Sequence, residues 1–342
     1  MPAAAKFVNV IGALAKIEST YGTAVALTTT SDGFLLQYPD RNGIPLTVDF
    51  AFDGQVGVNP GNLSNLPLSA PGGKSYSVDL PLRFKGAGAA YSASVVPPAA
   101  HLALQIAGFD AAVTTTTTVE KWTYTPQVVT SAYKSATFGF YARGELWAAK
   151  GGIADWSFTF DNPGPPTHTF ALKAIANGDV TDVTLPSITY ASNSTDPPNA
   201  NGITCVIGSF TTNAVVYSGS FALNRTIEPR VALTSSTGHE GFIPGGYAPE
   251  LTLQVEDTAF VGSPYHTSAG LDPIKLREAA TKITVSVQFG STQYNRWKLT
   301  LSNAQLFNVQ PSTNGRVATW DLTFKPSAST PIALDDLSVV FD

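Results

Sequence analysis

The chain has 342 residues, enough to bury one large hydrophobic core or two ordinary ones. Charged residues make up only 13% of it, and the net charge is −5 with no basic run. This balance argues against sequence-specific nucleic-acid binding, which needs clustered Lys and Arg to neutralise phosphates. A surface so poor in charge costs little to desolvate, so it suits extensive contact between proteins.

Neither a signal peptide nor a membrane span is expected. Asn9 and Gly12 interrupt the apolar stretch near the start, and no stretch approaches the ~18 apolar residues of a spanning helix. Cys205 is the only cysteine, and with no cationic or His neighbour it is predicted to be a small core residue. A chain that can form no internal disulfide fits folding in a reducing cytoplasm.

The first element that the sequence marks is the segment from Asp49 to Gly73. It is rich in Gly, Pro and Asn, too long for a tight hairpin and too apolar for a purely solvated loop. We predict a long loop here that makes a contact through its apolar residues, which are Val56, Val58, Leu63, Leu66 and Leu68.

From residue 76 onward, short alternating runs separated by Gly, Pro and Asn predict strands. They cover 76–84, 137–142, 145–149, 155–160 and 167–172, and later 250–256, 282–288, 294–301, 304–309 and 316–324. Alternation buries one face of a sheet and leaves the other polar, as in antiparallel sheets. We therefore predict an all-β protein.

Two short helices interrupt the strands. Pro97 opens the first, which Gly108 ends. Asp272 caps the second, with Pro273 in its first turn. Each is two to three turns long, so we expect the helices to flank a sheet rather than to form a bundle.

The elements occur twice in the same order, which indicates an internal duplication. Each half has a strand, a helix, two strands and a hairpin, and the hairpin's last strand ends in Lys173 or Lys325. We expect two tandem modules, over 1–192 and 193–342, joined near a loop rich in Ser, Asn and Pro.

No set of residues predicts catalysis or a metal site. The four His residues are scattered, and we expect His168 to be solvated on the polar face of its strand. Gly86 and Gly88 imitate a dinucleotide-binding fingerprint without its third glycine, so we expect no cofactor. We predict that the protein is not an enzyme, although a glycosidase carboxylate pair is left open.

An aromatic sugar-binding platform is the remaining possibility for a small-ligand site. Packing in the core and at the sheet interfaces is the simpler interpretation of the aromatic residues concerned. They are Trp122, Tyr124, Trp147 and Trp297.

Four stretches, taken in order and spacing, are similar to the tail tube (major tail) proteins of bacteriophages with long non-contractile tails. The resemblance covers roughly residues 7–190, and the second half matches more loosely. No single motif carries it. The stretches are Ala15–Thr23, Ser77–Leu82 with Gly86–Gly88, Val119–Pro126, and Val180–Pro186.

The resemblance implies a β-sandwich or barrel module with a short flanking helix, whose copies assemble as rings. The inner strands of neighbouring modules then join into one barrel, which gives every edge strand a partner. Because the family's rings contain six modules and this chain carries two, we expect trimeric, pseudo-hexameric rings. Stacked rings would form the virion's tail tube, after folding in the host cytoplasm.

The expected partners are further copies of the chain, a tape-measure protein, and tail terminator and distal-tail proteins. DNA would only pass through, and bound phosphates would slow it. We therefore expect an acidic lumen, with Asp79, Glu250 and Glu256 as candidates, and a 49–73 loop that reaches the next ring. Two alternatives stay open: a distal-tail or baseplate hub protein, and a carbohydrate-binding β-sandwich module.

Overall fold

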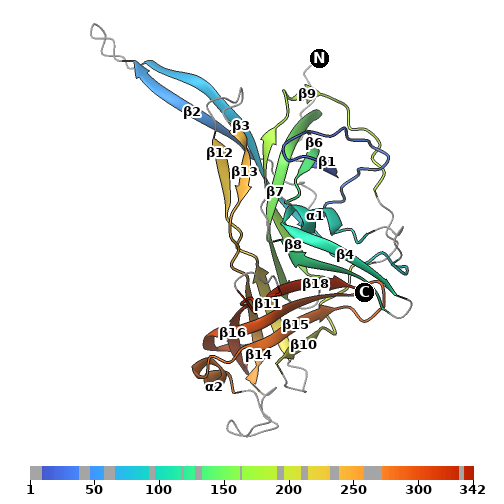
Figure 1. Ribbon diagram of the computed structural model, residues 1–342, viewed down its shortest axis with the longest axis vertical. Coiled ribbons are helices and arrows are strands. Elements are labelled where there is room, and N and C mark those ends of the chain that lie inside the picture. The colour runs from blue at the N-terminus through green and yellow to red at the C-terminus, as the bar shows by residue number, and fades with distance from the viewer. Residues whose placement is uncertain are drawn as a thin grey trace.

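The computed structural model describes residues 10–37, 47–57, 66–91, 97–116, 119–127, 133–161, 164–190, 196–208, 215–231, 239–257, 272–330 and 335–342. Within these ranges the chain is built of β-strands with two short helices (Figure 1), which confirms the all-β prediction. The strands are β1 (Val10–Ile17), β2 (Thr47–Gly57), β3 (Leu66–Leu82), β4 (Phe109–Thr116), β5 (Val119–Pro126), β6 (Ala136–Ala142), β7 (Glu145–Asp161), β8 (Thr167–Ala176), β9 (Thr181–Asp182), β10 (Thr204–Ile207), β11 (Val216–Ala222), β12 (Ile227–Val231), β13 (His239–Pro244), β14 (Glu250–Glu256), β15 (Ile283–Phe289), β16 (Trp297–Asn314), β17 (Val317–Lys325) and β18 (Leu337–Phe341).

The two predicted helices are present but shorter than expected. Helix α1 spans His101–Ile106, and Gly108 ends it with a φ of 82°. Helix α2 spans Pro273–Glu278, where the Asp272 side chain accepts hydrogen bonds from two backbone N–H groups of the first turn, as predicted.

Sixteen strands join in one antiparallel network, and β12 and β13 form a separate ribbon. The main path runs β2–β3–β8–β7–β11–β14–β17–β16–β18–β5–β4. Strands β7 and β16 are unusually long, at 17 and 18 residues. Each pairs with one set of neighbours through its first half and with another through its second half.

One pairing scheme occurs twice along the chain. In the first half, β1 pairs with β6, β6 with β7, β7 with β9 and β8, and β8 with β3. In the second half, the same relations hold for β10, β15, β16, β18, β17 and β14 in the corresponding places. The helices also correspond, because α1 follows β3 and α2 follows β14.

The repeat extends to the register of individual residues. Ile153 lies opposite Lys173, and Gln305 lies opposite Lys325. A bulge falls at the same place in both long strands, at Gly151 and Asn303, which have φ values of 62° and 49°.

We predicted two separate strands at each of these places, and that was wrong. A bulge residue with positive φ bends the backbone without ending the strand, so each pair of predicted strands forms one long strand.

The loop predicted over 49–73 is also wrong. Strands β2 and β3 pair across this segment, from Thr47 opposite Ser77 to Gly57 opposite Leu66, and the hairpin projects from the body as an arm (Figure 1). Of the five apolar residues named above, Val56 lies in β2 and Leu66 and Leu68 lie in β3; Val58 and Leu63 lie outside the described residues. Ladder hydrogen bonds between two strands outweigh the turn-forming Gly and Pro residues.

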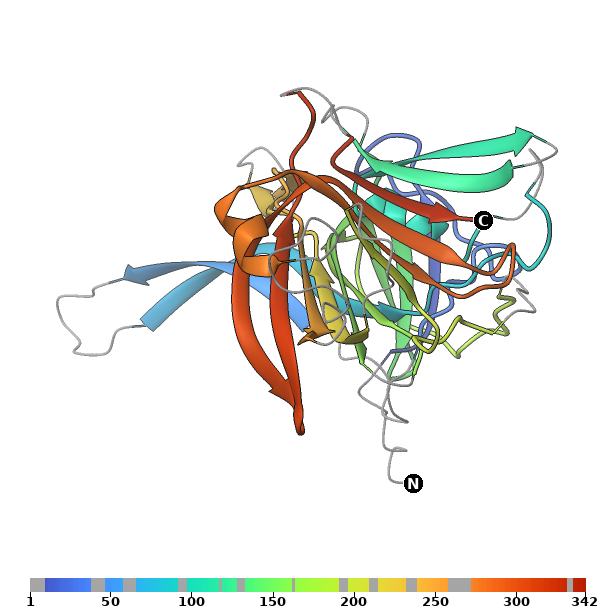
Figure 2. The same cartoon turned by 90° about the horizontal axis from the view of Figure 1, so that it is seen from below.

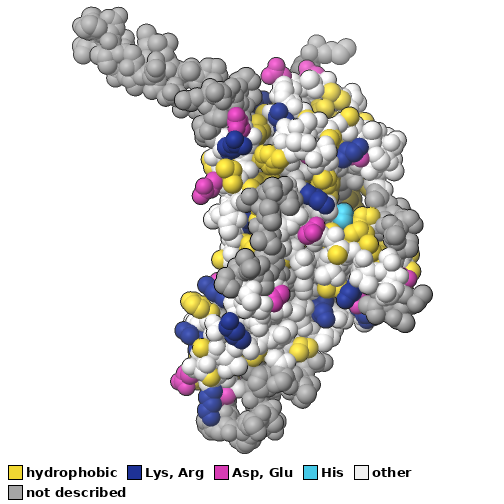
Figure 3. Space-filling view, in the orientation of Figure 1, with side chains coloured by type: hydrophobic (Ala, Val, Ile, Leu, Met, Phe, Trp, Pro, Cys, Tyr) yellow, Lys and Arg dark blue, Asp and Glu magenta, His cyan; other side chains and the backbone are white. Residues whose placement is uncertain are grey.

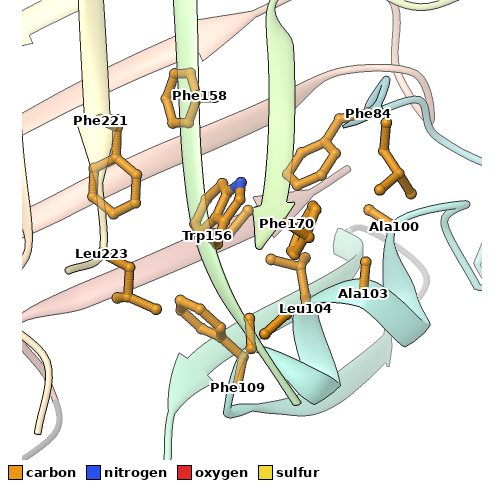
Figure 4. Close-up of a cluster of buried hydrophobic side chains, with 14 of the residues drawn as sticks. Phe84, Ala100, Ala103, Leu104, Phe109, Trp156, Phe158, Phe170, Phe221 and Leu223 are labelled. Atoms are coloured by element: carbon orange, nitrogen blue, oxygen red, sulfur yellow. The ribbon is translucent and has the colours of Figure 1, made fainter. Parts of the chain in front are cut away.

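The larger of two clusters of buried apolar residues in the described part of the chain runs through both halves. Figure 4 shows its densest part, where aromatic side chains of β7, β8 and β11 meet helix α1. Cys205 is 2% exposed, as expected of a core residue, and burial raises the pKa of its thiol to about 12.

Gly86 lies against the backbone of the second half, and its N–H donates to Asn295 Oδ1 over 3.1 Å. A Cβ added there would lie 1.9 Å from the Tyr294 carbonyl oxygen, whereas one added at Gly164 would meet nothing within 4 Å. We expect Gly86→Ala to lower the free energy of unfolding by about 1–3 kcal/mol and Gly164→Ala to leave it nearly unchanged. Urea denaturation would measure both, and equal losses would contradict the contact.

Candidate assembly surfaces

The two halves join through two strand pairs, β7 with β11 and β5 with β18. Strand β11 of the second half pairs with β7 of the first, from Ser218 opposite Asp161 to Ala222 opposite Ser157, and its other edge pairs with β14. The result is a continuous antiparallel sheet, β3–β8–β7–β11–β14–β17–β16, to which both halves contribute. A sheet that already crosses the boundary between two repeats could extend further in the same way.

Aromatic side chains fill the space behind this sheet at the junction. Trp297 of the second half lies over Phe158 and His168 of the first, with ring centroids 5.4 and 5.0 Å apart. Phe289 stacks on Trp297 at 4.3 Å and meets Phe158 at 6.1 Å. The strands β15 and β16 of the second half therefore cover the inner face of the first half's sheet.

His168 is fully buried, which overturns our expectation of a solvated side chain. Its ring stacks on Phe84 at 3.6 Å, and Trp156 Nε1 donates to His168 Nδ1 over 3.3 Å. Burial lowers the pKa of His168 well below its usual 6.5, and Arg83 adds to this effect, so the ring is neutral. Since His168 shares a face of β8 with Phe170 and Leu172, the alternation of the strand could have predicted its burial.

A buried arginine also bridges the halves. The backbone N–H of Arg225, just beyond β11, donates to Asp155 Oδ1 over 3.0 Å. Its guanidinium is under the rings of Tyr133 and Tyr247, at 5.1 and 5.7 Å from their centroids. A Cβ on Gly108 would lie 2.0 Å from Arg225 Nη1, so the glycine that ends α1 also admits the arginine.

The stretch Ala15–Thr23, which contributes to the family resemblance, folds as a clamp. The buried Glu18 carboxylate accepts hydrogen bonds from the hydroxyls of Ser135 and Thr137, over 2.5 and 2.8 Å, and from the Gly151 N–H over 2.9 Å. Gly151 is the bulge residue of β7, so Glu18 stabilises the bend of the long strand.

Tyr21 extends this clamp to the other half. Its hydroxyl donates to the carbonyl oxygen of Phe242 in β13 and accepts from the N–H of the same residue, both over 2.7 Å. The Tyr21 hydroxyl therefore satisfies both backbone polar groups of Phe242, whose opposite residue in the β12–β13 ribbon is Pro229.

The outer face of the continuous sheet is polar and acidic. The strands alternate, so most buried apolar residues point inward and Ser, Thr and charged residues point outward. Ile153 and Ile175 are exceptions, because they lie on the outer face and are buried against Phe242 of β13. Asp79, Glu250 and Glu256, the three predicted lumen residues, all lie on this outer face. Carboxylates outnumber amines among the described side chains of the face: Asp79, Asp155, Asp161, Glu250, Glu256 and Asp321 against Lys150, Lys173 and Lys325.

Two of the predicted acidic residues have side-chain partners there. Lys325 Nζ lies 3.1 Å from Glu250 Oε2, and the Tyr217 hydroxyl donates to Glu256 Oε2 over 2.7 Å. Asp79 lies opposite Ala171 in the β3–β8 ladder and is exposed. The structure brings the three carboxylates to one face but does not gather them into one cluster.

The described residues show few features of a metal-binding or small-molecule site. Among them, no three His, Cys, Asp or Glu side chains are grouped closely enough to hold a metal ion, and no helix is long and apolar enough to span a membrane. The aromatic residues considered as a sugar platform are buried or half-buried against the core, as we expected; they are Trp122, Tyr124, Trp147 and Trp297.

No protein-family model matches the chain, and a search of curated proteins finds no match.

Burial of His168 predicts acid sensitivity. An unfolded His binds a proton below pH 6.5 whereas the buried one does not, so this group's contribution to stability is complete above pH 6.5 and is lost as pH falls. We expect the free energy of unfolding to fall between pH 6.5 and 5 less steeply in His168→Phe than in the wild type, by up to ~1.4 kcal/mol per pH unit.

Urea denaturation at several pH values would measure both slopes. Partial burial lowers the pKa of His101 to about 4. Burial raises the pKa values of the half-buried Asp155 and the buried Asp336, and these raised values act on stability in the opposite direction. These groups are the same in both proteins, so the difference in slope reports His168. Identical slopes would contradict its burial.

Proposed function

We propose that this protein is a virion structural protein that polymerises as stacked rings into the tail tube of a long-tailed bacteriophage, the conduit for DNA ejection. The observation that carries the proposal is the continuous sheet, in which one pairing scheme occurs twice and the two occurrences join edge to edge. We infer that they are two tandem modules, over 1–192 and 193–342, and that chains join as the modules do.

The ends of this sheet favour assembly over a solitary chain. Beyond residue 305, β16 pairs with β17 on one edge, and no strand among the described residues pairs with its other edge. Figure 2 shows this orange-red hairpin extending from the body. An exposed strand edge is an aggregation hazard in a monomer, and closure into a barrel gives it a partner.

The outer face of the sheet suits a channel that DNA must cross without binding. Its Ser and Thr hydroxyls are neutral, and its carboxylates repel phosphates. No grouping of Lys and Arg interrupts it among the described side chains named above. The face therefore supports the acidic lumen that we expected.

The rival interpretations differ in what they need. A carbohydrate-binding module needs exposed, clustered aromatic rings, and Trp297 and Tyr124 are fully buried. A distal-tail or baseplate hub uses the same module but stops at one ring. Tape-measure, tail terminator and distal-tail proteins would be the partners of a tube protein in the virion.

Electron microscopy of the purified protein tests the proposal directly. We expect tubes of stacked rings. Each ring should contain three chains with pseudo-sixfold symmetry, because three chains of two modules each supply the six modules of a ring. Six chains per ring would refute the stoichiometry. Single rings would favour the hub, and dispersed monomers that bind a glycan array would favour the carbohydrate module.

The arm formed by β2 and β3 is proposed to contact the next ring. Deleting residues 54–69 and joining Asp53 to Ala70, which lie opposite each other, through an Asn-Gly turn should shorten the arm without disturbing the body. We expect folded rings that no longer form long tubes. Gly164→Ala serves as a control that should polymerise normally, and full-length tubes from the shortened chain would exclude the role.

The lumen should carry net negative charge. In a reconstruction of the tube, we expect Asp79, Glu250 and Glu256 to face the channel, with carboxylates outnumbering Lys and Arg on its wall. Replacing all three by lysine should create a channel wall that retains DNA in a salt-dependent manner. A positively charged channel in the wild-type tube would show this expectation to be wrong.

A further inference from the structure

A groove lies on the second half where helix α2 meets the β16–β17 hairpin. It has a volume of about 710 Å³. Ile274 of α2 is 51% exposed, although it is a large apolar residue. The other lining residues are Arg277, Glu278, Ala280, Asn308, Val309, Pro311 and Trp320. This region lies at the lower end of the molecule in Figure 3, where Lys and Arg side chains gather.

The register of the strands shows which part of the first half corresponds to this groove. Pro311 lies opposite Trp320, as Phe158 lies opposite His168. Val309 lies opposite Leu322, as Trp156 lies opposite Phe170. Three of the lining residues, Val309, Pro311 and Trp320, are therefore the counterparts of side chains that are buried in the first half.

What buries these counterparts is the other half of the same chain. Phe289 and Trp297, which lie opposite each other where β15 turns into β16, cover Phe158 and His168. The equivalent position on the second half has no such cover among the described residues, and this leaves the groove. The contact that buries the inner face of the first half's sheet is therefore present in the first half, and the corresponding contact in the second half is missing among the described residues.

The repeat also shows which residues of the first half correspond to Phe289 and Trp297. Ala142 and Glu145 lie opposite each other where β6 turns into β7, as Phe289 and Trp297 do in the second half. Glu145 also pairs with Asp182 of β9, as Trp297 pairs with Phe341 of β18. In Figure 1, β6 and β9 lie at the upper end of the molecule and α2 at the lower end. The turn of one chain therefore cannot reach the groove of the same chain.

We propose that the groove between α2 and the β16–β17 hairpin binds the β6–β7 turn, residues 142–145, of a second copy of this chain. The inference rests on the proposed function, because ring closure supplies that second copy. The charges of the two surfaces are mixed and can pair: Arg277 and Glu278 line the groove, and the turn carries Arg143 and Glu145.

Cysteine cross-linking tests this contact. The variant Glu145→Cys/Pro311→Cys, in a Cys205→Ala background, places thiols at the counterparts of Trp297 and Phe158, whose rings are 5.4 Å apart within one chain. A short bismaleimide should link chains into dimers and closed trimers. Each single-cysteine variant should give no trimer, and neither should the control Glu145→Cys/Ser218→Cys, because Ser218 lies on the outer face of the sheet.

A second pair of variants reports the groove without added cysteines. Trp320→Glu puts a carboxylate into the groove, and we expect it to abolish ring formation while the chain stays folded by circular dichroism. Ile243→Glu changes an apolar residue of β13 that is 48% exposed and does not line the groove, and it should assemble. Assembly by both variants would overturn the proposal, as would trimers from the control cysteine pair.

The outcomes separate this inference from the proposed function. Tubes that form without cross-linking between residues 145 and 311 would overturn the inference and leave the tube intact. Single rings that cross-link would support the groove contact but contradict the tube. Dispersed wild-type monomers that never cross-link would contradict both.

Discussion

Backbone hydrogen bonding along the second part of β7 is the constraint on which the rest of the structure depends. Every N–H and C=O of a buried strand needs a partner, and β8 supplies only one edge of β7. The other edge is paired by β11, which the chain supplies after β9 and β10. The two halves consequently share one sheet and one apolar cluster. Neither half could lose the other without exposing both a strand edge and the aromatic face around Trp156.

The bulged strands make this arrangement possible. Strands β7 and β16 each change pairing partners near a residue with positive φ, Gly151 or Asn303. The buried Glu18 carboxylate accepts a hydrogen bond from the Gly151 N–H, and Tyr21 is hydrogen-bonded to Phe242 of β13. A buried carboxylate is costly unless it is hydrogen-bonded, and here each bond fixes the bend or the neighbouring half. The clamp therefore fixes the bend of β7 and its position relative to β13.

This geometry accounts for the low charge content of the chain. A sheet whose outer face is made of hydroxyls and a few carboxylates is soluble, yet it can approach another surface at small desolvation cost. Among the few cations on that face, Lys325 lies beside Glu250. Two apolar residues that remain exposed on the second half, Ile274 and Phe307, lie at its far end, where the repeat lacks a cover.

The sequence by itself determined the β class, the cap at Asp272, the burial of Cys205, and the repeated order of strand and helix. These features depend on alternation, turn residues and local hydrogen bonds, which act within a few residues. Only the tertiary structure decided that 49–73 pairs as a hairpin, that the predicted strand pairs merge through bulges, and that His168 is buried beneath Trp297. Each of these features depends on a partner strand or ring from elsewhere in the chain, and no local pattern specifies that partner. For His168 the partner ring lies more than a hundred residues away.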